Sequence, residues 1–156
     1  MTRGMAWARA GLVLGIVLAL DQISKHAIAS SVSPGDSRPV LPGIELVHVT
    51  NHGVAFGVLA GHTAVSVVVG AALAGLVAYF AWQANRPLLW LPTGLLVGGA
   101  VGNVIDRVRD GAVTDFIKVP LWPAFNLADA AITVGVLALL YVLEEGARGA
   151  RRPARE

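Results

Sequence analysis

Four long apolar stretches constrain this chain more than any other feature. They cover residues 10–29, 63–82, 88–105 and 124–143. A helix needs about 20 mostly apolar residues to cross a bilayer. The second and third stretches contain no charged side chain, the fourth contains only Asp129, and the first contains Asp21 and Lys25. We therefore predict an all-α polytopic membrane protein with four transmembrane helices, folded as a single domain over residues 1–156.

The composition argues against most soluble classes of protein. Hydrophobic residues make up 55% of the chain and charged residues 14%, whereas a soluble domain carries about 25% charged residues. A soluble domain of this size buries only about 68–70% of the surface of its unfolded chain, too little to hide so many apolar side chains. A soluble enzyme, a disordered chain and a nucleic-acid-binding protein are therefore not expected. The chain has no cysteine, which excludes disulfides, zinc–thiolate sites and thiol nucleophiles.

Arginines near the ends of the stretches predict which side of the membrane each end faces. Arg3 and Arg9 precede the first stretch, and Arg86 lies in the short turn between the second and the third. Four more follow the last stretch: Arg148, Arg151, Arg152 and Arg155. Because Lys and Arg are enriched on the cytoplasmic side, both termini are expected there. Residues 3–29 also resemble a cleaved signal peptide, but its removal would break this alternation of sides.

The two longer connections are expected on the outer side of the membrane. They cover residues 30–62 and 106–123. In the first, residues 33–36 (SPGD) are typical of a turn, and residues 44–50 are rich in β-branched side chains and roughly alternating, which predicts a strand. We expect a small β-structure lying on the outer membrane surface.

Three glycines at four-residue spacing lie in the third stretch: Gly94, Gly98 and Gly102. Small residues at this spacing let transmembrane helices approach closely. The stripe therefore predicts a packing face for neighbouring helices.

Polar side chains gather at one end of the predicted bundle. On the predicted topology all of the following lie at the outer end: Asp21, Lys25, Asn51, Asn103, Asp106, Arg107, Asp115, Asn126 and Asp129. A charge in the membrane interior costs about 2.5–3.5 kcal/mol, so such residues are usually paired or functional. The inner end has only arginines and glutamates that water can solvate. This asymmetry predicts a site near the outer leaflet.

Some of these residues have a purely structural explanation, whereas two point to chemistry. Asp21 and Lys25 are four apart and can pair on one helix face, and Arg107 can extend its guanidinium to the interface. Asp115 and Asp129 are more informative, because two close carboxyls cannot both ionise cheaply and share one proton. One carboxylate can then take a proton from water while the other carboxyl donates one. This is the chemistry of an aspartic protease.

The spacing alone leaves other functions open. A proton relay in a small transporter would use the same two carboxyls, although a transporter needs polar residues along its whole path. A structural membrane subunit would not need two carboxyls and three asparagines at one end. Asp106, Asp110 and Asp115 do not reproduce the metal-binding series of a phospholipid-synthesising transferase. There is no Ser–His–Asp set and no H-E-x-x-H motif, and the histidines lack metal-site spacing.

Five blocks of the sequence, in order, resemble the lipoprotein signal peptidase family, also called signal peptidase II or prolipoprotein signal peptidase. They are residues 21–25 (DQISK), 51–56 (NHGVAF), 98–107 (GGAVGNVIDR), 113–116 (VTDF) and 125–129 (FNLAD). The third and fifth blocks are the most specific. In the second, His52 and Val54 stand at variable or small-residue positions, and in the first, Ser24 replaces a frequent threonine. No acidic or amide position of the pattern is lost.

This resemblance implies both an architecture and an activity. The architecture is four transmembrane helices with an extracytoplasmic β-cradle. The activity is that of an aspartic endopeptidase of the bacterial inner or cell membrane. It removes the signal peptide of a prolipoprotein by cutting just before a cysteine that carries diacylglycerol. The resemblance implies no metal and no organic cofactor, and it implies globomycin-type inhibitors and membrane lipids as ligands.

The resemblance also implies a role for each matched residue. Asp115 and Asp129 are the expected catalytic dyad. The expected substrate-binding residues are Asn51, Gly53, Asn103, Arg107 and Asn126. Asp21, Lys25 and Asp106 are expected to hold the site in shape.

Overall fold

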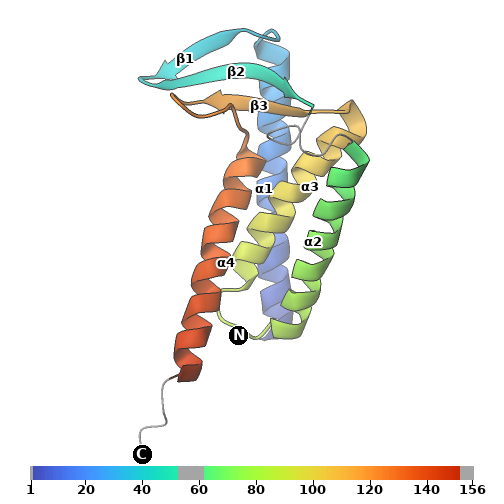
Figure 1. Ribbon diagram of the computed structural model, residues 1–156, viewed down its shortest axis with the longest axis vertical. Helices are drawn as coiled ribbons and strands as arrows, with labels where there is room; N and C mark the ends of the chain where they lie inside the picture. The colour runs from blue at the N-terminus through green and yellow to red at the C-terminus, as the bar shows by residue number, and fades with distance from the viewer. Residues whose placement is uncertain (1, 53–61, 152–156) are drawn as a thin grey trace, which may run out of the picture.

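Four helices and a small sheet form the described part of the chain, residues 2–52 and 62–151 of a computed structural model (Figure 1). The helices are α1 (Arg3–Ser31), α2 (His62–Gln83), α3 (Trp90–Asp110) and α4 (Leu127–Arg151). The strands are β1 (Ser37–Leu41), β2 (Ile44–Asn51) and β3 (Val113–Lys118). The sheet lies across one end of the bundle, and α1 begins and α4 ends at the other (Figure 1).

The central helix of the bundle is α3. Both α1 and α4 pack extensively on it, and α2 packs on it more lightly. Within the described residues, no Cα atoms of α2 and α4 lie within 8 Å of each other. Helix α3 therefore lies between α2 and α4 (Figure 1).

Close packing on α3 depends on glycines that leave no room for a side chain. A Cβ atom on Gly94 would lie 2.7 Å from the Ala10 carbonyl oxygen of α1, and one on Gly99 would lie 2.5 Å from the Ala128 oxygen of α4. The predicted stripe, Gly94, Gly98 and Gly102, lies in such contacts with α1. Gly99 was not part of that stripe, and it brings the start of α4 against α3.

Each helix continues past the C-terminal end of its predicted span, because helical hydrogen bonding continues through the polar ends. In contrast, α3 begins at Trp90 and α4 at Leu127, later than the predicted residues 88 and 124. By length and composition, α1 and α4 are long and apolar enough to cross a membrane. Over Val68–Gln83, α2 is a shorter apolar helix. The third predicted span continues as helix to Asp110, where Gly111 ends it with a φ of 73°. Crossing of the membrane by all four helices remains a prediction.

The sheet contains the predicted strand and two further strands. Residues 44–50 lie in β2, as expected, and the strand order is β1–β2–β3 with antiparallel pairing throughout. In the pairing of β2 with β3, Val49 lies opposite Asp115 and Asn51 opposite Val113. This register carries Asp115 across the end of the helix bundle.

The start of α4 differs slightly from the predicted start of the span at residue 124. Phe125 forms two backbone hydrogen bonds with Ile117, at 2.8 and 3.0 Å, so it is held as an extended partner of β3. Asn126 then caps the helix, because its side-chain oxygen accepts a hydrogen bond from the Asp129 amide at 2.9 Å. The helix therefore begins at Leu127, with Asp129 in its first turn.

Candidate active site

Asp115 and Asp129 meet through the side chain and backbone of Asn126. The Asn126 Nδ2 donates to Asp115 Oδ1 at 2.8 Å, and the Asn126 backbone amide donates to Asp129 Oδ2 at 3.3 Å. The backbone pairing of Phe125 with β3 sets this arrangement, because it holds the residue next to Asn126 beside the strand that carries Asp115. Two carboxyls 14 positions apart are thereby brought to one site.

Each carboxyl also accepts a hydrogen bond from a second asparagine. The Asn51 Nδ2 donates to Asp115 Oδ2 at 2.9 Å, and the Asn103 Nδ2 donates to Asp129 Oδ1 at 2.8 Å. All four carboxyl oxygens therefore have an N–H donor. These bonds fix the orientation of both carboxyls before any substrate arrives.

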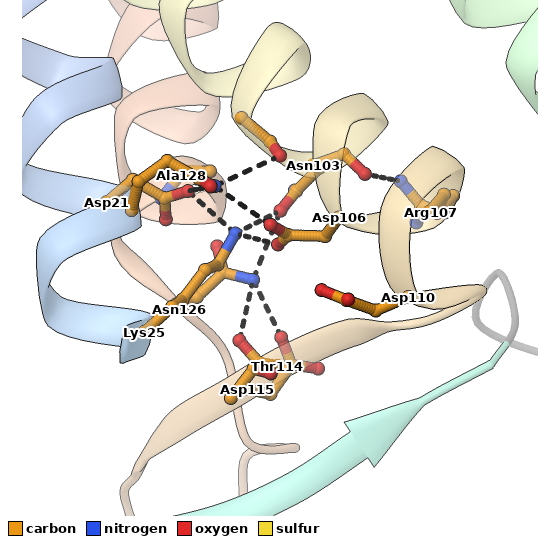
Figure 2. Close-up of polar contacts among 12 residues, drawn as sticks. Asp21, Lys25, Asn103, Asp106, Arg107, Asp110, Thr114, Asp115, Asn126 and Ala128 are labelled. Carbon is orange, nitrogen blue, oxygen red and sulfur yellow. Dashed lines mark hydrogen bonds and ion pairs between the residues drawn. The ribbon is translucent and has the colours of Figure 1, made fainter. Parts of the chain in front are cut away.

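A buried lysine lies directly behind the pair. Lys25 Nζ lies 2.7 Å from Asp21 Oδ2 and forms a second ion pair with Asp106. It also donates to Asn103 Oδ1 at 2.9 Å. Figure 2 shows these side chains converging from α1 and α3. Lys25, Asp21 and Asp106 are almost fully buried, so the lysine compensates two carboxylates that would otherwise be costly to bury.

The lysine also determines which way the Asn103 amide points. Asn103 Oδ1 accepts from Lys25 Nζ and from Asn126 Nδ2, at 2.9 and 3.2 Å. Both of those partners are donors, so the oxygen of the amide must face them. The Asn103 NH₂ is thereby left to donate to Asp129.

Asp21 and Asp106 connect the network to the backbone. The Asp21 Oδ1 accepts from the Ala128 amide at 2.9 Å, which ties α1 to the first turn of α4. The Gln22 Nε2 donates to Asp106 Oδ1 at 2.8 Å. Gln22 lies within one of the sequence blocks, yet nothing in its spacing marked it as a partner of Asp106. It is the contributor to the site that the sequence analysis missed.

The remaining expected site residues lie farther from the dyad or outside the described residues. The Arg107 Nη1 donates to the Asn103 carbonyl oxygen at 3.2 Å (Figure 2), and the structure gives it no contact with either dyad carboxyl. Gly53 lies outside the described residues. Across residues 2–52 and 62–151, no group of three or more His, Asp or Glu side chains is arranged to hold a metal ion.

Burial is the main reason that the pKa of Asp115 is raised above its ordinary value. The nearby charge of Asp129 raises it further, whereas the hydrogen bonds from Asn51 and Asn126 oppose the shift. A raised pKa favours the protonated carboxyl. Asp115 is therefore easier to protonate than an exposed aspartate.

The chain matches the family described as "Signal peptidase (SPase) II" over residues 13–144. It is 47% identical over 131 residues to the lipoprotein signal peptidase of Moorella thermoacetica, covering 82% of this chain and 87% of that protein. It is 40% identical over 135 residues to the lipoprotein signal peptidase of Pelotomaculum thermopropionicum, covering 85% and 89%.

Two solved structures have the same fold. Both are titled as bacterial membrane enzyme structures by the in meso method, at 2.3 Å and 1.9 Å resolution. The first has a TM-score of 0.84 and 30% identity, with 94% of each chain covered. The second has a TM-score of 0.79 and 33% identity, covering 86% of this chain and 91% of that one.

Proposed function

The chain belongs to the signal peptidase II family, and from this premise we propose that it is an aspartic endopeptidase acting on diacylglyceryl-modified prolipoproteins. Removal of signal peptides from prolipoproteins is the activity of the family, and the chain is a membrane protease of this kind. We propose further that Asp115 and Asp129 hydrolyse the peptide bond that directly precedes the lipidated cysteine. The observation that carries it is the bridge of Asn126 between the two carboxyls.

In the first step, the ionised Asp129 takes a proton from a water molecule as the oxygen of that water attacks the scissile carbonyl carbon. The protonated Asp115 donates its proton to the carbonyl oxygen, which gives a neutral tetrahedral diol. Burial and the charge of Asp129 support Asp115 as the acid, because both raise its pKa. The hydrogen bond from Asn103 holds the Asp129 carboxyl in a fixed orientation for this role.

In the second step, the C–N bond breaks. Asp129 returns its proton to the leaving amine, and one diol hydroxyl returns a proton to Asp115, so both carboxyls recover their starting states. The products are the carboxyl end of the signal peptide and the free amine of the lipidated cysteine. One water is consumed, and no metal or organic cofactor takes part in the proposed steps.

The proposed substrate-binding residues surround this dyad. Asn51, Asn103 and Asn126 each donate a hydrogen bond to a dyad carboxyl, which places all three where the peptide would bind. Arg107 and Gly53 complete the proposed set. Asp21, Lys25 and Asp106 are proposed as support, and their contacts with Asn103, Gln22 and the Ala128 amide favour that role.

We place the whole chain, residues 1–156, in the bacterial inner membrane as one multi-pass domain. The terminal arginines support cytoplasmic termini, which would set the dyad near the outer leaflet. Asp115 is in β3 and Asp129 is in the first turn of α4, so the dyad lies at the sheet end of the bundle, opposite the start of α1 (Figure 1). Membrane lipids and globomycin-type inhibitors are the other proposed partners.

The test is cleavage of a purified prolipoprotein with and without diacylglycerol on its cysteine. Only the lipidated form is expected to be cut, at the bond before the cysteine. Asp115→Asn and Asp129→Asn are each expected to lower the rate by at least about 10²–10⁴-fold, because each removes one partner of general acid–base catalysis. Asp110→Asn is the matched control, since Asp110 is an exposed carboxyl paired with Arg109. A folded dyad variant that cleaves near the parent rate would overturn the assignment.

A further inference from the structure

An apolar groove opens beside Asp129 on the face of α4 that is turned away from α3. It encloses about 340 Å³ and is lined by Trp122, Phe125, Asp129, Ala130, Thr133 and Val134. Apart from the carboxyl and one hydroxyl, its walls are hydrocarbon and aromatic rings. We call it the α4 groove. It therefore joins a candidate catalytic carboxyl to an apolar surface.

The α4 groove continues as an exposed stripe along the helix. Val134, Leu137 and Tyr141 follow Ala130 at three- or four-residue spacing, so they share one helix face. These three residues are 54%, 63% and 58% exposed. At 1.5 Å per residue the distance from Ala130 to Tyr141 is about 16 Å, close to half of a hydrocarbon core about 30 Å thick. The groove and stripe thus form an apolar track about one leaflet long.

Within the described residues, two directions away from the dyad are filled by protein. Behind it lie Lys25, Asn103 and Asn126, at most 6% exposed. Above it lies the sheet, where Asn51 of β2 is bonded to Asp115 of β3. A large substituent on the residue next to the scissile bond needs an open path, and the α4 groove supplies one.

A second apolar pocket lies on another face of α4. It encloses about 320 Å³ between α2, α3 and α4, and its walls include Ala72, Leu96 and Ile132. Asp129 is not part of its lining. Because the lipid is attached to the cysteine directly after the cleaved bond, the pocket that contains Asp129 is the better match for it.

We propose that the α4 groove binds an acyl chain of the lipidated cysteine and directs it along α4 into the bilayer. This inference rests on the proposed function. Moving an acyl chain from lipid into an apolar groove gains little free energy, because lipid tails are already apolar. The groove therefore acts mainly by orientation: it sets the position of the scissile carbonyl relative to Asp129.

The test compares two synthetic prolipoprotein peptides, whose cysteines carry either two long acyl chains or two short ones. Ala130→Phe fills the α4 groove and is expected to lower kcat/KM for the long-chain peptide by about tenfold or more, a usual effect of altering an apolar pocket. The short-chain peptide is expected to lose much less. Trp122→Ala, which removes an exposed wall of the groove, is expected to reduce the discrimination between chain lengths. Ala72→Phe makes the same substitution in the second pocket and is expected to leave the discrimination unchanged.

An equal loss on both peptides would overturn the inference, because it would indicate general damage near Asp129. The inference would also be overturned if Ala130→Phe did not lower kcat/KM for the long-chain peptide, or if Ala72→Phe changed the discrimination between chain lengths. If Ala130→Phe fails to fold, judged by thermal unfolding in detergent, Trp122→Ala alone decides. The wild-type chain separates the two proposals: its failure to cut any lipidated peptide would refute the proposed function, whereas normal cutting without these variant effects refutes only the groove.

Discussion

Asp115 is buried where its charge is poorly solvated, and this has a consequence for stability. Its pKa is raised, first by burial and then by the charge of Asp129. A carboxyl whose pKa is higher in the folded state than in the unfolded chain stabilises the fold when the pH is below its pKa in the unfolded chain. That stabilising contribution is lost as the pH rises through the pKa of the carboxyl in the folded state. Ionisation of Asp115 is therefore expected to weaken the fold at neutral pH, as charged groups of active sites often do.

We predict that the difference in Tm, Asp115→Asn minus wild type, becomes more positive as the pH rises from about 4 to about 7. The wild type must ionise the buried Asp115 over this range, whereas the variant has no ionisable group at that position. Thermal unfolding in detergent at several pH values measures this difference. Asp110→Asn is the control: Asp110 is exposed and its pKa is lowered by the hydrogen bond from Arg109, so the trend should be absent or reversed. A flat or falling difference for Asp115→Asn would contradict the prediction.

Among the residues that the structure describes, Lys25 is the one cation that contacts both Asp21 and Asp106. Lys25→Met keeps much of the side-chain volume but leaves two buried carboxylates uncompensated. We predict a loss of about 3–5 kcal/mol in the free energy of unfolding, the usual cost of removing one partner of a buried ion pair. Denaturant or thermal unfolding in detergent measures it.

The control for Lys25 is Arg109→Gln, which breaks an exposed ion pair and is expected to cost no more than about 1 kcal/mol. A second variant, Asp21→Asn combined with Lys25→Met, removes one of the stranded charges and should recover part of the loss. Equal stability of Lys25→Met and Arg109→Gln would show that the network is not a structural support.

At the scale of helices, the geometry of the dyad depends on how closely α4 approaches α3. Gly99 faces the Ala128 carbonyl oxygen, and Asp129 is the next residue. In Gly99→Ala the new Cβ would lie 2.5 Å from that oxygen, so α4 must move. A displacement of the order of 1 Å between catalytic groups can cost about 10²-fold in rate. We predict a loss of activity approaching that size, together with lower thermal stability.

The matched control is Gly11→Ala in α1, where a Cβ has no neighbour within 4 Å. Alanine favours a helix over glycine by about 0.8–1.0 kcal/mol, so this variant should be as stable as the parent or more so, with full activity. If Gly99→Ala behaves like Gly11→Ala in both cleavage rate and Tm, the close contact between α3 and α4 does not position the dyad.

At the scale of the whole molecule, we expect the sheet and the two ends of the chain on opposite sides of the membrane. Reporter fusions at Glu156 and after Arg86 are expected on the cytoplasmic side, because arginines lie near both of these positions. A fusion near Asp36 is expected on the outer side. Activity of side-specific reporters in cells measures this. Signals from one side at all three positions would contradict the topology, and a mature chain starting at residue 30 would identify a cleaved signal peptide.

The sequence alone determined the class of protein, the helices, one strand and the chemical character of the site. Apolar stretches predict helices because the backbone must satisfy its own hydrogen bonds in lipid, and costly polar residues at one end point to function. Strand β3 was not predicted, because its pairing with β2 and Phe125 joins segments far apart in the chain. Local periodicity carries no information about such partners.

Only the tertiary structure decided how the polar residues are connected. It placed Asn126 between Asp115 and Asp129, and it turned the Asn103 amide toward Asp129 through the bond to Lys25. It also brought Gln22 onto Asp106 and opened the α4 groove beside Asp129. The physical reason is that hydrogen-bond direction and open space depend on the relative positions of α1, α3, α4 and β3. The glycine contacts of α3 and the pairing of Phe125 with β3 set those positions, whereas spacing along the sequence does not.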